Sequence, residues 1–107
     1  MFLSNMDYIP NTELEILGLV RGGIVLSKDV GSDFMAGLVS IVGGELVGYT
    51  DMLEDARRIA TERMEAQAEK LYADAVINIR YSTSAVMAGA AEIMAYGTAV
   101  RYKQHMD

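Results

Sequence analysis

The stretch TDMLEDARRIATERMEAQAEKLY, residues 50–72, decides the fold, because it is the one long helix that the sequence clearly encodes. Mostly apolar side chains recur in it at three- and four-residue spacing and form one stripe: Leu53, Ala56, Ala60, Met64, Gln67 and Leu71, widened by Ile59. Charged side chains lie opposite: Glu54, Asp55, Arg58, Glu62, Glu65 and Glu69. We therefore predict an amphipathic helix, capped at its start by Thr50 or Asp51, with a solvated acidic side.

A hydrophobic segment, Glu15 to Ser27, precedes this helix and predicts a strand. Its alternate residues are apolar on both sides, with Ile16, Val20 and Ile24 on one side and Leu17, Leu19 and Val25 on the other. This pattern is typical of a strand that is covered on both faces. Glycines within it, at positions 18, 22 and 23, indicate a bulge, a bend or close approach of another backbone.

A short helix is predicted between this strand and the long helix. Ser32 or Asp33 can cap it, and its apolar residues run to Val42. The pair Gly43-Gly44 ends it, because glycine accepts the left-handed conformation at a helix C-terminus. Residues 45–49 then connect to the long helix.

Two further strands are predicted after the long helix. The segment Ala75 to Tyr81 alternates, with Ala75, Ile77, Ile79 and Tyr81 on one side and Asn78 and Arg80 on the other. Residues 82–89 are small and polar and suit a hairpin connection, and a final strand runs from about Ala91 to Lys103. We expect residues 1–13 to be a flexible arm, 14–103 a single domain and 104–107 a C-terminal tail.

The predicted fold is α+β: a small antiparallel sheet with one long and one short helix, in β-α-α-β-β order. The long helix can cover one face of the sheet, whereas the short helix covers little of the other. An apolar second face needs a partner, and another copy of the same chain is the simplest one. The hydrophobic content of 51% is high for a small monomer and also favours contact with another copy.

Composition excludes several classes of protein. The chain has 107 residues, a net charge of −6 and no run of Lys or Arg, which argues against nucleic-acid binding. It has no Cys, so disulfides and zinc-thiolate sites are excluded. Neither a signal peptide nor a membrane-spanning stretch is present, so no membrane contact is expected and the cytoplasm is the default location.

The sequence shows no evident catalytic set. The one histidine, His105, lies near the end of the chain. Asp29, Asp33, Glu45 and Asp51 border the predicted loops and could bind a hard cation, but their spacing fits no calcium loop, and caps and surface charges are the commoner interpretation. No metal ligand or cofactor is assigned. Candidate pocket residues between subunits are Asp33, Arg80, Tyr81 and Tyr96, with Tyr102 and Arg101 as further members of the tyrosine and arginine set.

An ordered set of residues then resembles a known family: Asp33, Phe34, Ala36, Gly43-Gly44, Tyr49, Ala56-Arg57, Ala60, Ala68, Ala73-Asp74-Ala75-Val76 and Gly97-Thr98-Ala99-Val100. Together they resemble the YbjQ-like family, an uncharacterised bacterial and archaeal family sometimes labelled heavy-metal-binding. The resemblance covers roughly Gly18 to Arg101. No single motif in it is specific, whereas the ordered set is.

The resemblance implies a small α/β subunit that assembles into a ring, commonly a pentamer, in which short strands help to join the subunits. It implies no particular activity. The metal label fits poorly, because soft metals prefer thiolate or imidazole ligands. The chain also departs from the family at Tyr72, where the family usually has Gly: Tyr72 either adopts a left-handed conformation at about 1 kcal/mol or the helix ends differently.

Three functional hypotheses remain open from the sequence. The first is a homo-oligomer without catalytic activity that binds a small ligand or ion. The second is a metal-binding protein that uses carboxylate or methionine ligands, since the chain has eight Met residues. The third is an enzyme whose site forms between subunits.

Overall fold

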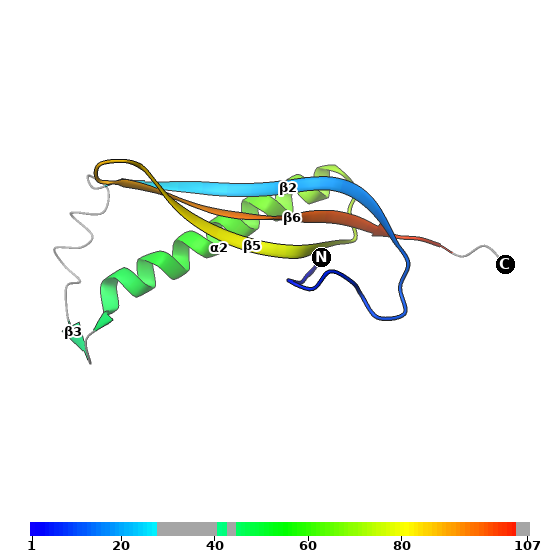
Figure 1. The fold of residues 1–107 in the computed structure, drawn as a ribbon, viewed down its shortest axis with the longest axis horizontal. Coiled ribbons are helices and arrows are strands. Elements are labelled where there is room, and N and C mark those ends of the chain that lie inside the picture. Colours follow the sequence, from blue (N-terminus) through cyan, green and yellow to red (C-terminus); the bar gives the residue numbers. More distant parts are fainter. Residues whose placement is uncertain (28–40, 43–44, 105–107) are drawn as a thin grey trace.

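The structure is a computed structural model that describes residues 1–27, 41–42 and 45–104. Its elements are β1 (Phe2–Leu3), β2 (Leu14–Ser27), β3 (Ile41–Val42), β4 (Glu45–Leu46), α2 (Val47–Lys70), β5 (Ala75–Met87) and β6 (Ala90–Tyr102). A four-stranded sheet has the order β1-β5-β6-β2, and β3 and β4 form a separate pair (Figure 1). The predicted α+β class, the long helix and the three main strands are confirmed. No helix among these residues is long and apolar enough to cross a lipid bilayer.

The sheet is mixed, whereas the sequence predicts an antiparallel one. β6 pairs antiparallel with β2 and with β5, but β1 runs parallel to β5. This additional strand comes from the segment that the sequence predicts as a flexible arm. Ser4 N donates to Val76 O at 3.0 Å, and Ile79 N donates to Ser4 O at 3.1 Å. Two residues are too short a strand to leave an alternating pattern, so the sequence gives no sign of β1.

The start of α2 differs from the prediction. The helix begins at Val47, so Thr50 and Asp51 lie inside it and the predicted cap is wrong. The last two residues of the predicted short helix, Ile41 and Val42, form β3 and pair with β4. Both are β-branched, which favours a strand. The rest of that predicted helix, including Asp33, lies outside the described residues.

The core lies between α2 and one face of the sheet. Small residues on the helix bring it close to the strands: Ala56, Ala60 and Ala68 are buried, with Met64 among them. They pack against Val20, Val76, Ile79, Ile93, Ala95 and Ala99 of the sheet. The predicted stripe is therefore confirmed at its centre and wrong at its end, since Gln67 and Leu71 are exposed and Ala68 is buried instead.

A bulge in β5 changes which side chains share a face. Asn78 has a φ of 56°, and the pairing with β6 shifts between Ile77 and Arg80. Asparagine tolerates this left-handed conformation better than most residues. As a result Ile79 packs toward α2 while Ala75 and Ile77 belong to a separate cluster, so the predicted common side for these three residues is wrong. β5 also continues to Met87, so only two residues separate it from β6 rather than the predicted eight-residue connection.

At the C-terminus of α2, Tyr72 adopts the left-handed conformation, which is the first of the two predicted alternatives. Tyr72 has a φ of 58°. Its N–H donates to Glu69 O at 3.0 Å, and Ala73 N donates to Ala68 O at 3.1 Å. This pair of bonds is a Schellman motif, which satisfies the last free carbonyls of the helix.

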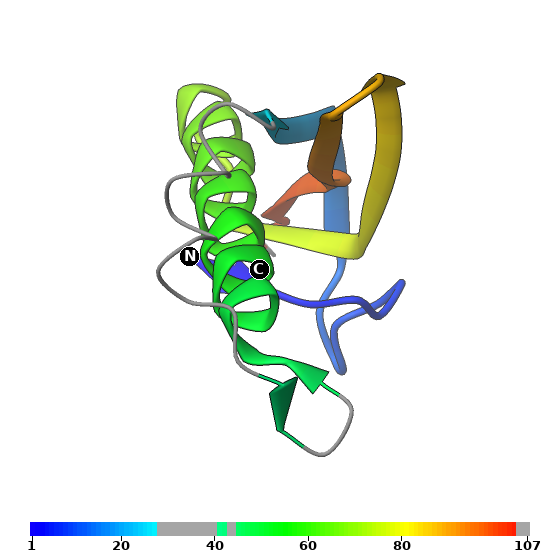
Figure 2. The same cartoon turned by 90° about the vertical axis from the view of Figure 1, so that its left-hand side faces the viewer.

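The face of the sheet away from α2 is only partly covered (Figure 2). Where β5 begins, Ile9 and Leu14 pack against Ala75, Ile77 and Val100. Side chains alternate along a strand, so residues next to those that contact α2 point away from it. Leu19, Val25, Met94 and Tyr96 do so, and we call the surface that they form the open face.

Candidate functional site

The structure brings two of the four predicted pocket residues into one hollow. Arg80 and Tyr81 line a hollow of about 540 Å³ at the β1–β5 edge, together with Leu3, Ser4, Asn5 and Ile79. Tyr96 lies directly opposite Arg80 on the neighbouring strand but does not line this hollow. Asp33 lies outside the described residues. The four predicted residues therefore do not appear together as a site in the described part of the chain.

We call this hollow the β5-edge hollow. Hydrogen bonds to the protein itself hold the side chains of Arg80 and Tyr81 in it. Arg80 Nη1 donates to Asn5 O at 2.9 Å and to Ile79 O at 3.0 Å. Thr61 Oγ1 lies 2.8 Å from Tyr81 Oη and donates to Arg57 O at 2.7 Å. Because a hydroxyl carries one proton, Tyr81 must donate to Thr61. Arg80 and Tyr81 thus tie the N-terminal segment and α2 to β5.

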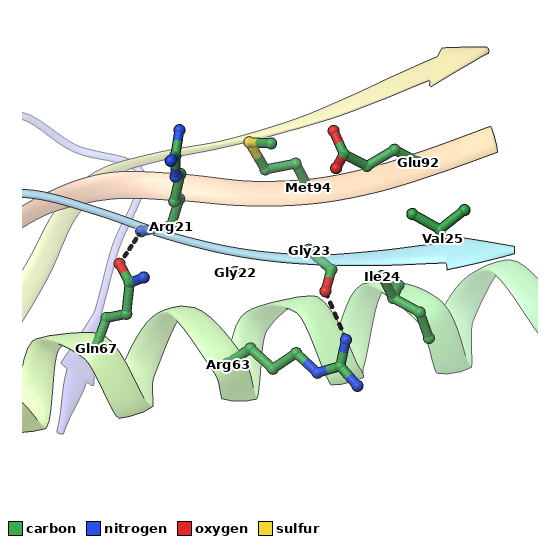
Figure 3. A pocket seen from close by; sticks show the side chains of 9 residues that line it. All are labelled: Arg21, Gly22, Gly23, Ile24, Val25, Arg63, Gln67, Glu92 and Met94. Atoms are coloured by element: carbon green, nitrogen blue, oxygen red, sulfur yellow. Dashed lines mark hydrogen bonds between the residues drawn. The ribbon is translucent and has the colours of Figure 1, made fainter. Parts of the chain in front are cut away.

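A second hollow, of about 590 Å³, lies at the outer edge of β2 (Figure 3). We call it the β2-edge hollow. It is lined by Arg21, Gly22, Gly23, Ile24 and Val25 of β2, Arg63 and Gln67 of α2, and Glu92 and Met94 of β6. Arg21, Met94 and Glu92 extend on the side of β2 away from α2, while Arg63 and Gln67 approach from the helix.

Two side chains of α2 bind the outward backbone groups of β2 in this hollow. Gln67 Oε1 accepts from Arg21 N at 2.9 Å, and Arg63 Nη1 donates to Gly23 O at 2.7 Å. β2 is the last strand of the described sheet, and such an edge presents N–H and C=O groups that need partners. The two bonds satisfy part of that edge and fix both side chains against the strand.

The charged groups of the β2-edge hollow are largely uncommitted. The guanidinium of Arg21 and the carboxylate of Glu92 make no hydrogen bond or ion pair with the residues that the structure describes. Arg63 uses one of its N–H groups, on Gly23 O. The hollow therefore offers two cations and one anion on a chain whose net charge is −6.

None of these charged residues was predicted as part of a site from the sequence. The glycines of the run Val20-Arg21-Gly22-Gly23 indicated only a bulge, a bend or close approach of another backbone. Arg63 lies 40 residues from its partner Gly23, so only the folded chain joins them. One signal was present: Gln67 is a polar residue in an otherwise apolar stripe, which indicates that it has a specific partner.

Of the four carboxylates considered for a hard cation, the structure describes two, and these lie on different elements. Asp51 is exposed on α2, Glu45 belongs to β4, and Asp29 lies outside the described residues with Asp33. Within residues 1–27, 41–42 and 45–104, no group of three or more His, Cys, Asp or Glu could hold a metal ion. His105 also lies outside this part of the chain.

Comparisons with known proteins agree on one family. The model of the YbjQ_1 family, described as "Putative heavy-metal-binding", matches residues 1–103. A UPF0145 protein of Alkaliphilus metalliredigens is 56% identical over 95% of this chain and 99% of its own length. A UPF0145 protein of Archaeoglobus fulgidus is 53% identical over 96% of each chain.

A solved structure has a similar fold. It is a crystal structure of a protein of unknown function from Pediococcus pentosaceus that belongs to the DUF74 family. The TM-score is 0.69, with 18% identity, over 96% of this chain and 98% of that one. At this identity the likeness shows the shared fold alone.

Proposed function

We propose, from the premise that this chain belongs to the YbjQ_1 family, that it is a homo-oligomeric protein that binds a small ligand. Membership is plain, since the family model covers residues 1–103 and a relative is 56% identical over nearly its whole length. The family description names heavy metals and the names of the relatives state no activity.

The observation that carries the proposal is the open face. Leu19 is 71% exposed and Val25 is 55% exposed, although both belong to the longest strand of the sheet. Tyr96 is exposed beside them. Arg21 lies between Leu19 and Val25 on this side of β2, and exposed apolar side chains bordered by polar ones often mark an interaction site. A second copy of the chain is an occupant that is present wherever the protein is made.

The shape of the subunit supports assembly. Its radius of gyration is 17.4 Å, against about 13 Å for a compact domain of this length. Its accessible surface is 7279 Å², against about 5900 Å² for a compact monomer of 11.7 kDa. An elongated subunit with surplus surface gains by burying part of it against neighbours. A closed ring, with the five copies that the family resemblance implies, would satisfy every subunit equally.

The ligand part of the proposal comes from the two hollows. Each has a volume in the range of pockets that hold small molecules, and each combines apolar walls with a few polar groups. In the β5-edge hollow, the side chains of Arg80 and Tyr81 are hydrogen-bonded to other residues of the protein. The β2-edge hollow keeps free charged groups, so it is the better ligand site.

Sedimentation velocity at micromolar concentration tests the assembly. We expect one species several times heavier than the 11.7 kDa chain. A monomer at that concentration would refute it. Native mass spectrometry of protein purified without added ligand then tests the ligand: a discrete added mass on each subunit supports binding, and its removal by unfolding identifies the compound.

A further inference from the structure

We infer that two copies of this chain pack open face to open face, with Arg21 of each copy in an ion pair with the partner's Glu92. This inference rests on the self-association proposed above, and it names the surface and the charged pair that hold two copies together. It sets no limit on how many copies the whole particle contains.

Arg21 and Glu92 both belong to the open face. A Cβ at Gly22 would meet the backbone of α2, so position 22 faces the helix and its neighbour Arg21 points away from it. Ile93 belongs to the cluster that packs against α2, so Glu92 beside it also points away. Figure 3 shows both side chains extending on the side of β2 away from α2.

The two charges have no ion-pair partner within the part of the chain that the structure describes. Glu92 is half-buried, and its Oε2 lies 3.6 Å from the position that a Cβ would occupy at Gly23. A carboxylate that is partly removed from water is costly unless a cation lies beside it. A guanidinium from a second copy would offset that cost.

The register of β2 and β6 makes the open face complementary to itself. Three successive rows of residues on this face cross the two strands: Arg21–Tyr96, Gly23–Met94 and Val25–Glu92. Neighbouring rows are about 7 Å apart, because every second residue of a strand faces the same side. A two-fold axis along the middle row, between two facing sheets, places the first row of one copy over the third row of the other.

This symmetry brings the opposite charges within reach of each other. Arg21 then faces the partner's Glu92, and Glu92 faces the partner's Arg21, so each contact contains two ion pairs. The two side chains of a pair start from strands that are offset by about 4.8 Å, on sheets about 10 Å apart. An extended arginine and a glutamate together cover that span.

The middle row suits the centre of such a contact. Met94 of each copy would meet the partner's Met94 on the axis, and methionine fills irregular gaps well. A Cβ at Gly23 would make only ordinary contacts within the chain, so packing of the single chain does not require glycine there. The missing side chain leaves room for the two methionines. Arg63 and Gln67 bind β2 from the α2 side and stay outside this contact, free to take part in the ligand site proposed above.

Charge reversals test the pairing by sedimentation velocity. R21E places two carboxylates together at both pairs, and E92R places two guanidinium groups together. We expect each variant alone to weaken the face-to-face association by about a hundredfold, and to sediment at half the mass of the natural protein or less. Mixed in equal amounts, the two variants should regain the natural mass, because the reversed charges are then opposite across the contact. A pair formed within one chain would not be restored by mixing.

Matched variants separate this pair from general effects of charge. R58E and E62R make the same reversals on the solvent side of α2, where Arg58 pairs with Glu62, and both should keep the natural mass. Circular dichroism checks that every variant is folded. If a reversal unfolds the chain, R21M and E92Q replace it: each removes a charge without adding one and should weaken the association by about tenfold.

Two results would overturn the inference: folded variants of Arg21 and Glu92 that keep the natural mass, or reversal variants that lose it and do not regain it when mixed. The natural protein keeps the two ideas distinguishable. If it assembles and its variants behave in either of these ways, the contact is refuted and the assembly stands. If it is a monomer at micromolar concentration, the proposed self-association itself is refuted.

Discussion

At the scale of single residues, the end of α2 depends on a tyrosine in a conformation that suits glycine. Tyr72 has a φ of 58°, and its side chain is 81% exposed, so little packing offsets the strain. We expect Y72G to raise the free energy of unfolding by up to about 1 kcal/mol, reduced somewhat by the freedom that glycine gains in the unfolded chain. Urea denaturation measures the change. L71G, one residue earlier where φ is not positive, should be destabilising instead.

The adjacent glycines of β2 give a second test at this scale. G22A places a Cβ on the backbone of Ala60 and Met64, so helix and strand must separate. We expect a loss of about 2 kcal/mol, typical of an overpacked core. G23A meets only ordinary contacts and should be neutral or slightly stabilising. Thermal unfolding of the two variants side by side decides the point; equal losses would show that β2 does not approach α2 as closely as the structure has it.

At the scale of elements, one arginine of β6 ties the sheet to the end of α2. Arg101 Nη2 donates to Leu71 O at 3.0 Å, and its Nε donates to Tyr72 O at 3.2 Å. R101M keeps the apolar part of the side chain and loses both bonds, so we expect it to cost about 1 kcal/mol. E15Q removes only the 3.7 Å ion pair with Arg101, which is half exposed, and should change stability little. Chemical denaturation at low and high salt separates the two contributions.

The elements also show what the sequence could and could not predict. α2, β2 and β6 are long and strongly patterned, and their predicted bounds lie within a few residues of the structure. β1 has only two residues, and its hydrogen bonds to β5, not a sequence pattern, make it a strand. The bulge at Asn78 reverses which side chains of β5 face α2. Neither is visible before the strands are paired. The candidate site was predicted less well. Arg80 and Tyr81 do line one hollow. The backbone partners of Arg63 and Gln67 lie at least 40 residues away in the chain, so only the folded chain brings them together.

At the scale of the whole molecule, the two sides of the sheet have different roles. The α2 side holds the main buried cluster, in which alanines and Gly22 allow close packing. The open face leaves large apolar side chains in solvent, and on the proposed assembly these meet other copies. The β2-edge hollow lies where the two sides meet. Its occupancy and the assembly are then coupled if a neighbour covers that edge.

The assembly can be tested on one side chain of the open face. Leu19 is 71% exposed in the single chain, so a charge placed there would stay in solvent unless another copy covers it. We expect L19E to bury an unpaired carboxylate at the subunit contact and so to shift the particle toward monomers, measured by light scattering after size exclusion. A66E adds the same group to the exposed side of α2 and should leave the mass unchanged. If L19E keeps the mass of the natural protein while staying folded, the contact does not use the open face, because no assembly that buries Leu19 would tolerate the charge.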